Sequence, residues 1–355
     1  MKNKFAVAAI AGLAALALTA CGGGGTAAPS SQAPAPAPAS SEAAPAPAPT
    51  GYPLTITDKN GDGIITMGFA QVGAESGWRT ANTQSYKDYF VKANGFELKF
   101  ADANQDADKQ KQDVRDFIAQ GVEVIDIAPV IDSGWEPVLQ EAIDAGIPVI
   151  ISDRMVSAPD SMYLFYFGGN MKAEGDRAVA WLKDYIGKNN VTDPINIVHL
   201  QGTLGSTAQK GRSQALTDAA PTNGWTIAYQ QTGEFTQAKG QEVMESFLQQ
   251  KKDFNVVYAE NDDMAYGAID AMNKAGIDVK SKIVISFDGN KSAVQMVIDG
   301  YIDVIAECTP LIAPQIGALI KKVLAGETVD KVQYSDEGVI DSTNAADKIK
   351  VAFGN

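Results

Sequence analysis

Ten short apolar runs, separated by amphipathic stretches of helix length, constrain the fold most strongly. The first run, residues 64–72, reads IITMGFAQV and is rich in β-branched residues. The other runs cover residues 96–103, 122–129, 148–154, 163–169, 195–202, 226–232, 255–262, 282–289 and 302–309. Apolar strands that alternate with helices form parallel sheets with helices on both faces. Because ten strands exceed what one compact sheet usually holds, we predict an α/β protein with two doubly wound parallel-sheet domains.

Polar side chains follow nearly every one of these runs. In doubly wound folds, ligands bind outside the carboxyl ends of the strands. The residues at these predicted ends are Glu75, Ser76, Trp78, Arg79, Asp102, Asn104, Asp153, Arg154, Asn170, Gln201, Thr203, Asn261, Asp262, Asp288 and Glu307. Carboxylate, amide and guanidinium groups offer donors and acceptors at fixed angles. The pattern therefore predicts a site for a ligand that carries many hydroxyl groups.

Some of these residues have a simpler explanation. Ser76, Asp102 and Asp262 fit the helix N-cap, where serine and aspartate are favoured. Trp78 fits burial between a helix and a sheet. The arginines cap nothing, so the ligand-binding interpretation depends on them most.

Two sequence patterns argue against a metal or cofactor. DKNGDGIIT (58–66) is similar to a calcium loop, but Phe69 occupies the position that needs a bidentate glutamate, which favours a polar turn over a strong site. The chain has one histidine and, beside Cys21, one further cysteine, Cys308, too few ligands for a zinc site. We expect no metal and no cofactor. Pairs of glutamate and aspartate could suggest a glycosidase, but nothing in the sequence distinguishes a catalytic acid from a nucleophile, so we expect no enzyme. Weak calcium binding at Asp58 and Asp62 stays open.

The first residues predict the cellular location. MKNK, a short apolar run and LTAC are typical of a lipoprotein signal peptide over residues 1–20, followed by lipid attachment at Cys21. An ordinary secretory signal or an uncleaved anchor is the alternative. Residues 21–53 are rich in Pro and Ala and predict a disordered tether. We therefore expect an extracytoplasmic protein, anchored by lipid to the outer face of the cell membrane.

The charge excludes one class of partner. The chain has 43 acidic and 29 basic residues, a net charge of −14, and two of the lysines fall in the predicted signal. Such an excess argues against nucleic acid and against a broad electrostatic contact with anionic lipid.

Several segments resemble the periplasmic-binding-protein family of sugar ABC transporters, in its ribose- and galactose-type branch with the galactofuranose binders. The segments are QVGAESGWRTAN, IAPVIDSGWEPVLQEA, VHLQGTLGSTA, TGEFTQAKGQEVMESFL and YAENDDMAYGAI, together with the motifs DR, NDxMAxGA and FDG. The resemblance implies two lobes joined by three hinge segments, with a sugar between them. It places the N-terminal lobe at residues 64–167 plus 309–331 and the C-terminal lobe at 168–308 plus 332–355.

The resemblance also implies roles for individual residues. Glu75, Trp78, Arg79, Asp153, Arg154, Asn170, Asn261 and Asp288 would contact the sugar. It adds Arg212 on a helix of the second lobe and Phe235 as a stacking ring. Glu307 stands where ribose binders carry Gln, which points away from ribose. KGRSQAL (210–216) and Gln237 depart from the pattern and leave the exact sugar open.

These observations together predict a monomeric substrate-binding lipoprotein that delivers a monosaccharide, galactofuranose-like or a related pentose or hexose, to the permease of an ABC importer. A sugar sensor for a signalling receptor is a variant of this hypothesis. The rivals are a secreted glycosidase, a transcriptional regulator of the same fold, and a binder of a nucleoside or an autoinducer. A regulator would need a DNA-binding segment before residue 64, where the sequence predicts only the signal and the tether.

Overall fold

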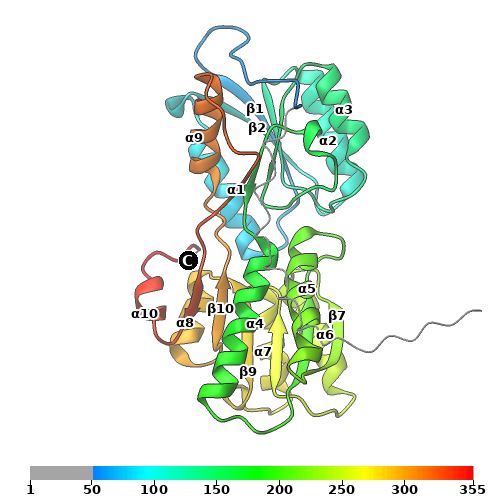
Figure 1. The fold of residues 1–355 in the computed structure, drawn as a ribbon, viewed down its shortest axis with the longest axis vertical. Helices are drawn as coiled ribbons and strands as arrows, with labels where there is room; N and C mark the ends of the chain where they lie inside the picture. Colours follow the sequence, from blue (N-terminus) through cyan, green and yellow to red (C-terminus); the bar gives the residue numbers. More distant parts are fainter. Residues whose placement is uncertain (1–50, 355) are drawn as a thin grey trace, which may run out of the picture. The chain divides into compact units, whose positions relative to one another are not determined.

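The structure, a computed structural model, describes residues 51–354 (Figure 1). The predicted signal peptide, Cys21 and tether residues 21–50 lie outside the described residues. Within the described part, no helix is both long and apolar enough to span a membrane.

The first sheet contains six strands in the order β11-β5-β4-β3-β1-β2. Their bounds are β1 Ile65–Gln71, β2 Phe96–Asp102, β3 Val124–Ile127, β4 Val149–Ser152, β5 Tyr166–Gly168 and β11 Val332–Tyr334. All neighbouring strands are parallel. The central strands β3 and β4 are buried along their whole length, which explains their continuous apolar sequences.

Helices cover both faces of this sheet (Figure 1). On one face, α1 (Gly77–Tyr89) and α9 (Ala313–Leu324) enclose a core with Tyr86 and Ile316. On the other, α2 (Ala107–Gln120) and α3 (Glu136–Asp144) bury Val114 and Leu139. Two short 3-10 helices, Lys92–Asn94 and Asp160–Met162, complete this lobe.

The second sheet repeats the arrangement in the order β12-β10-β9-β8-β6-β7. Its strands are β6 Asn196–Gln201, β7 Thr226–Thr232, β8 Val256–Ala259, β9 Ile283–Asp288, β10 Val304–Glu307 and β12 Val339–Asp341. The edge strand β12 is antiparallel to β10, and the other neighbours are parallel.

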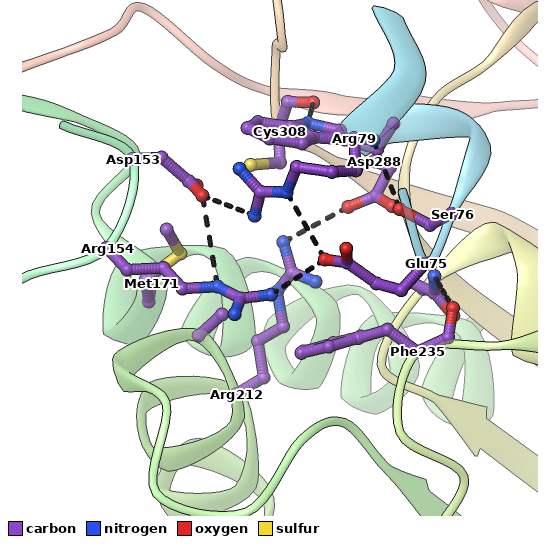
Figure 2. Close-up of a pocket in the computed structure, with 13 residues that line it drawn as sticks. Glu75, Ser76, Arg79, Asp153, Arg154, Met171, Arg212, Phe235, Asp288 and Cys308 are labelled. Atoms are coloured by element: carbon purple, nitrogen blue, oxygen red, sulfur yellow. Dashed lines mark hydrogen bonds and ion pairs between the residues drawn. The ribbon is translucent and has the colours of Figure 1, made fainter. Parts of the chain in front are cut away.

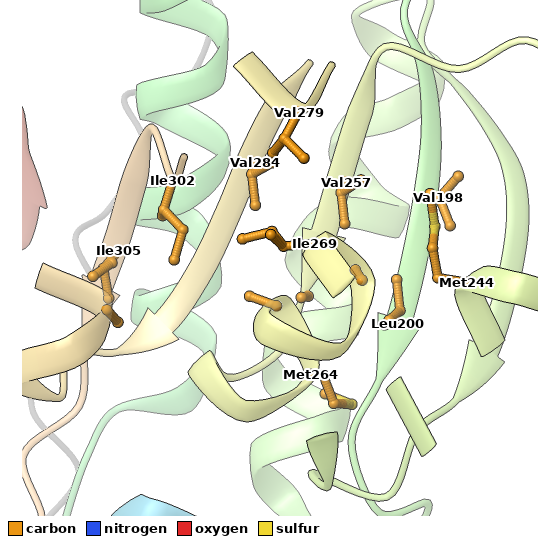
Figure 3. Close-up of a cluster of buried hydrophobic side chains, with 14 of the residues drawn as sticks. Val198, Leu200, Met244, Val257, Met264, Ile269, Val279, Val284, Ile302 and Ile305 are labelled. Atoms are coloured by element: carbon orange, nitrogen blue, oxygen red, sulfur yellow. The ribbon is translucent and has the colours of Figure 1, made fainter. Parts of the chain in front are cut away.

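The second sheet is also covered on both faces. Figure 3 shows one core, in which Val257 of β8 and Met264 of α7 belong to the same buried cluster. Helices on this face are α6 Gln237–Leu248, α7 Asp262–Lys274, α8 Lys291–Asp299 and α10 Ala345–Lys348, with a 3-10 helix at Val279–Ser281. On the opposite face, α4 (Met171–Lys188) and α5 (Thr207–Thr222) bury Leu182 and Leu216.

Three segments pass between the two sheets: β5 leads to α4, β10 leads to α9, and β11 leads to β12. The prediction of two doubly wound domains joined by three crossovers is confirmed. One boundary was wrong. Val332 pairs with Tyr166 of β5, so the first sheet extends to Tyr334 and not to residue 331. The sequence did not reveal β11 because a three-residue strand among polar neighbours leaves no apolar run.

The packed body begins earlier than the predicted tether end at residue 53. The Val149 backbone N–H donates to the Tyr52 hydroxyl over 2.9 Å, and Ile56 is buried. Residues 58–64 form the predicted polar turn that leads into β1, because the carboxylate of Asp58 accepts hydrogen bonds from the backbone N–H groups of Gly61 and Gly63.

Candidate functional site

A small cavity lies between the carboxyl ends of the two sheets (Figure 2). The first lobe supplies Glu75, Ser76, Trp78, Arg79, Asp153 and Arg154. The second lobe supplies Met171, Ala208, Arg212, Phe235, Asn261 and Asp288, and the second crossover supplies Cys308.

The start of α1 fixes the position of Arg79. The Ser76 hydroxyl accepts a hydrogen bond from the Arg79 backbone N–H over 3.1 Å, which makes Ser76 the N-cap. The side chain of Arg79 therefore leaves the first turn toward the cavity and is only 2% exposed.

A buried ionic network forms the wall of the first lobe (Figure 2). Arg79 Nη2 donates to Asp153 Oδ2 over 2.6 Å, and its Nε donates to Glu75 Oε1 over 3.2 Å. Arg154 Nη2 reaches the same Glu75 oxygen over 3.3 Å. Burial alone would raise the pKa of Glu75, but the two guanidinium groups outweigh burial and hold that pKa below its usual value. The wall therefore presents fixed charges of both signs.

Two atoms of this network have no hydrogen-bond partner within the described protein. Glu75 Oε2 can accept, Arg154 Nη1 can donate, and both are buried. An unsatisfied buried polar atom costs about 1–3 kcal/mol. Arg79, in contrast, is fully engaged, because its Nη1 donates to Gln71 Oε1 over 3.2 Å. A ligand hydroxyl would satisfy the two free atoms and recover this cost.

The wall of the second lobe is organised by Arg212. Its guanidinium contacts Glu174 Oε2 at 2.7 Å and Asp288 Oδ1 at 3.2 Å, and it donates to the backbone oxygen of Glu260. Burial raises the pKa of Asp288 well above its usual value, although Arg212 opposes the shift. Arg212 is thus occupied by protein groups and positions Asp288 at the cavity.

Aromatic rings line the cavity from both lobes. Phe235 of the second lobe lies with its ring centre 5.2 Å from the guanidinium carbon of Arg154. Trp78 is 5% exposed, and its indole N–H donates to the Cys308 carbonyl over 2.8 Å. Trp78 therefore packs against the second crossover and also borders the cavity. Its burial and its place beside the cavity are compatible with each other.

Three cavity residues have left-handed backbone conformations. The φ angles are +59° at Asp153, +62° at Phe235 and +94° at Asp288. Such angles are tolerated by aspartate but are rare for a bulky aromatic residue. Strained backbone of this kind gathers at ligand-binding sites, where the surrounding structure imposes it.

Asn261 combines a structural role with its place at the cavity. Its side-chain oxygen accepts from the Met264 N–H over 2.9 Å and caps α7, and its amide donates to the Phe235 carbonyl over 3.0 Å. The same side chain therefore caps α7 and fixes the backbone of Phe235 at the cavity.

Nine predicted ligand-binding residues line the cavity, and four lie elsewhere: Asp102, Asn170, Thr203 and Glu307. Asp102 ends the edge strand β2, where its carboxylate accepts from the Asn104 N–H. Asn170 caps α4 through the Ala173 N–H. Thr203 borders a separate surface pocket, and Glu307 is paired with Lys348 at 2.8 Å. The structure does not bring these four to the cavity. Asp102 and Thr203 lie in other parts of their lobes, and the side chains of Asn170 and Glu307 are engaged in a helix cap and an ion pair.

Sequence reasoning missed Met171, Ala208 and Cys308 as lining residues. Met171 and Ala208 lie in the first turns of α4 and α5, whose N-termini face the same edge as the strand ends. A search of first-turn residues would have found them, but apolar side chains gave no chemical signal.

One group of possible metal ligands exists among the described residues. Glu174, Cys308 and Glu337 bring donor atoms within 4.8 Å of one another. Arg212 already contacts Glu174 at 2.7 Å, and Arg177 lies 3.6 Å from Glu337. Since these guanidinium groups compete with a cation, we assign no metal to the group.

Comparisons with known proteins agree with this geometry. A family model for the periplasmic binding protein domain matches residues 67–328. The galactofuranose-binding protein YtfQ of Escherichia coli (strain K12) is 41% identical over 279 residues, which cover 76% of this chain and 85% of the relative.

Solved structures show the same similarity. One from Mycobacterium smegmatis, in complex with β-D-fucofuranose, has a TM-score of 0.76 and 42% identity, and the match covers 79% of this chain and 93% of that chain. Another is the periplasmic component of an arabinose ABC transporter from Shewanella sp. ANA-3, bound to L-arabinofuranose. It has a TM-score of 0.75 and 37% identity, with 81% and 95% of the two chains covered.

Proposed function

The chain belongs to the periplasmic-binding-protein family, and from that premise we propose that it captures a monosaccharide in the furanose form between its two lobes. It is a binding protein and not an enzyme. The observation that carries the proposal is a cavity whose buried Glu75 Oε2 and Arg154 Nη1 lack partners, with Trp78 and Phe235 at its walls.

The site suits recognition of a small polyol. The free carboxylate oxygen and guanidinium nitrogen pair with ligand hydroxyls, and the aromatic rings cover apolar C–H faces. A site that pairs each hydroxyl leaves its own buried groups unpaired when one hydroxyl is inverted or missing. Such a site selects stereochemistry without any chemical step.

We expect the two lobes to close on the ligand, because both lobes contribute residues to the cavity. Glu75 and Arg154 belong to the first lobe, and Phe235 and Asp288 to the second. A ligand that contacts both walls binds the closed arrangement more tightly than the open one and shifts the hinge equilibrium toward closure.

The relatives support a furanose. Proteins with 37% to 42% identity are named for galactofuranose or were solved with fucofuranose and arabinofuranose. We therefore propose a pentofuranose or hexofuranose of this stereochemical group as the ligand class.

A thermal-shift screen tests the ligand. D-Galactose, D-fucose, L-arabinose, D-ribose and D-fructose would each be added to the purified protein, and a ligand at 100 times its Kd adds about 2.7 kcal/mol of stability. The anomeric carbon signal of a bound ¹³C-labelled sugar then reports the ring form. If no sugar raises the melting temperature, the ligand class is wrong, and a bound pyranose would contradict the furanose assignment.

We further propose that the protein is a lipid-anchored monomer that delivers its sugar to the permease of an ABC importer outside the cytoplasm. The family and the transporter component among its relatives support the importer, and the sequence around Cys21 supports the anchor. Metabolic labelling with a lipid precursor should mark the wild type but not Cys21→Ser. Equal labelling of both proteins would contradict the anchor.

A further inference from the structure

The three crossovers meet at one buried group of side chains. Gly169 belongs to the first crossover, Cys308 to the second and Glu337 to the third, while Glu174 lies in the first turn of α4. A Cβ atom placed on Gly169 would lie 2.3 Å from Glu174 Oε1, 3.3 Å from Glu337 Oε2 and 3.5 Å from Cys308 Sγ. These three atoms therefore surround a single point in the hinge.

One carboxyl oxygen at this point lacks a hydrogen-bond donor within the described part of the chain. Glu174 is fully buried, and its Oε1 has no partner among the described residues. The side chain of Glu337 is 3% exposed. Its Oε1 accepts from the Ser335 hydroxyl over 2.7 Å and from the Thr309 N–H over 3.1 Å, while its Oε2 has Arg177 Nη2 at 3.6 Å and lies on the side of Glu174. Two ionised carboxylates repel each other in this position, whereas one added proton supplies the missing donor.

We propose that Glu337 takes up one proton when the lobes close and turns it toward Glu174, so that sugar binding takes up a proton at the hinge. The inference rests on the proposed function, since it concerns closure on the same ligand. Because Glu174 lies in α4 just after the first crossover and Glu337 lies within the third crossover, hinge rotation changes their separation and with it the affinity of Glu337 for the proton.

Other charged groups lie near this pair. Arg177 of α4 contacts Glu337, Arg212 of α5 contacts Glu174, and the Cys308 thiol lies within 4.8 Å of both carboxyl groups. The same pocket as Glu337 is also lined by Asp288 of β9, Glu307 of β10, Asp336 of the third crossover and Lys348 of α10. Arg212 is bound to Glu174 Oε2, and Lys348 is bound to Glu307. Arg177 lies 3.6 Å from Glu337 and is the weak counter-charge of that residue. Burial, followed by the charge of Glu174, raises the pKa of Glu337 to about 8.

The direction of the pH effect follows from this shift. A carboxyl whose pKa is higher in the closed state than in the open state binds a proton on closure. Its contribution to sugar affinity is complete below the open-state pKa and is lost as the pH rises through about 8. Affinity for the sugar should therefore be weaker at pH 9 than at pH 6.5, by about tenfold at most for each pH unit.

Calorimetry measures the proton directly. Sugar is titrated into the protein at pH 7 in two buffers that differ in ionisation enthalpy, and the difference in heat gives the number of protons taken up. We expect the wild type to take up about one proton more than Glu337→Gln. The glutamine amide donates to Glu174 as the added proton would, so this variant should bind more tightly than the wild type at pH 9. A damaged hinge would weaken binding at every pH instead.

A second variant tests the same idea with the carboxyl in place. Ser335→Ala removes a donor that stabilises ionised Glu337, so the pH at which affinity is half lost should move upward. Glu327→Gln, at an exposed position of the first lobe away from the crossovers, is the control and should behave as the wild type. Equal proton uptake in the wild type and Glu337→Gln would overturn the proposal, as would an unmoved midpoint in Ser335→Ala. If no sugar binds to any variant, the proposed function fails instead.

Discussion

Arg154 is the arginine of the cavity whose guanidinium keeps a free nitrogen. Arg79 and Arg212 are occupied by carboxylates and carbonyls, while Arg154 Nη1 has no partner among the described residues. Ligand binding should therefore depend on Arg154 through direct contact and on the other two through the carboxylates that they position.

Replacing Arg154 by Ala should weaken sugar binding by at least about thirtyfold, because loss of one partner of a buried charge network costs about 2–5 kcal/mol. Calorimetry measures the Kd, and circular dichroism checks the fold. Arg115→Ala is the control, since Arg115 pairs with Glu141 at the surface with both side chains more than a third exposed. Normal binding by Arg154→Ala would show that the cavity is not the sugar site.

Asp126 links stability to pH through a buried carboxyl. The Tyr86 hydroxyl donates to its Oδ2 over 2.7 Å, and burial raises the pKa of Asp126 to about 7. In the unfolded chain the pKa is about 3.9. The stability that this group contributes is therefore complete below about pH 3.9 and is lost as the pH rises through 7.

Asp126→Asn removes this titration. The difference in melting temperature between the variant and the wild type should change in favour of the variant from pH 5 to pH 8. The sign of the difference at pH 5 does not affect this expectation. Thermal unfolding at three pH values measures the slope, and Asp116→Asn at an exposed position of α2 is the control. A temperature difference that stays constant across the range would contradict the assigned pKa.

At the scale of elements, the end of β6 and the loop before α6 meet beneath the cavity. Gly202 follows β6, and an added Cβ would lie 1.9 Å from Cζ of Phe235. Gly202→Ala must therefore displace the ring that lines the cavity, and we expect sugar affinity to fall by at least about tenfold, or 1.4 kcal/mol.

A second glycine provides the control. A Cβ at Gly187, near the end of α4, would meet nothing within 4 Å, so Gly187→Ala should bind normally and gain up to about 1 kcal/mol of stability. Calorimetry and thermal unfolding of both variants measure the two effects. Full affinity in Gly202→Ala would show that the Phe235 ring adds nothing to binding.

The sequence predicted the long, buried elements well, because continuous apolar runs mark parallel strands directly. It missed β11 and β12, whose three residues each are stabilised by pairing to a neighbour and not by their own composition. The same limit applies to the site. The residue type predicted that Asp102 and Glu307 could bind hydroxyls, but only the fold shows that one ends an edge strand and the other pairs with Lys348. Cys308 lines the cavity because the second crossover passes beside it, and no pattern in the sequence near Cys308 predicts the path of that crossover.

At the scale of the whole described body, the two lobes contact each other beyond the cavity. The Gly77 N–H donates to Asp263 Oδ2 over 3.1 Å, and the Met155 N–H donates to the Thr207 hydroxyl over 2.9 Å. Lys210 Nζ of the second lobe lies 2.6 Å from Asp132 Oδ2 of the first. None of these bonds needs the ligand, so they add to the stability of the closed arrangement for every sugar.

The Asp132–Lys210 pair allows this contribution to be measured apart from recognition. Exposed ion pairs contribute about 0.2–1 kcal/mol, so Asp132→Asn should weaken binding up to about fivefold, with the effect on the dissociation rate. Since the pair lies outside the cavity lining, the factor should be the same for each sugar that binds, and it should shrink in high salt. Glu242→Gln, which breaks a pair within α6 alone, should leave affinity unchanged. Stopped-flow measurements give the dissociation rates of two different sugars from the wild type and from Asp132→Asn. If only one sugar dissociates faster from the variant, Asp132 takes part in recognition, because a contact that only favours closure acts on all ligands alike.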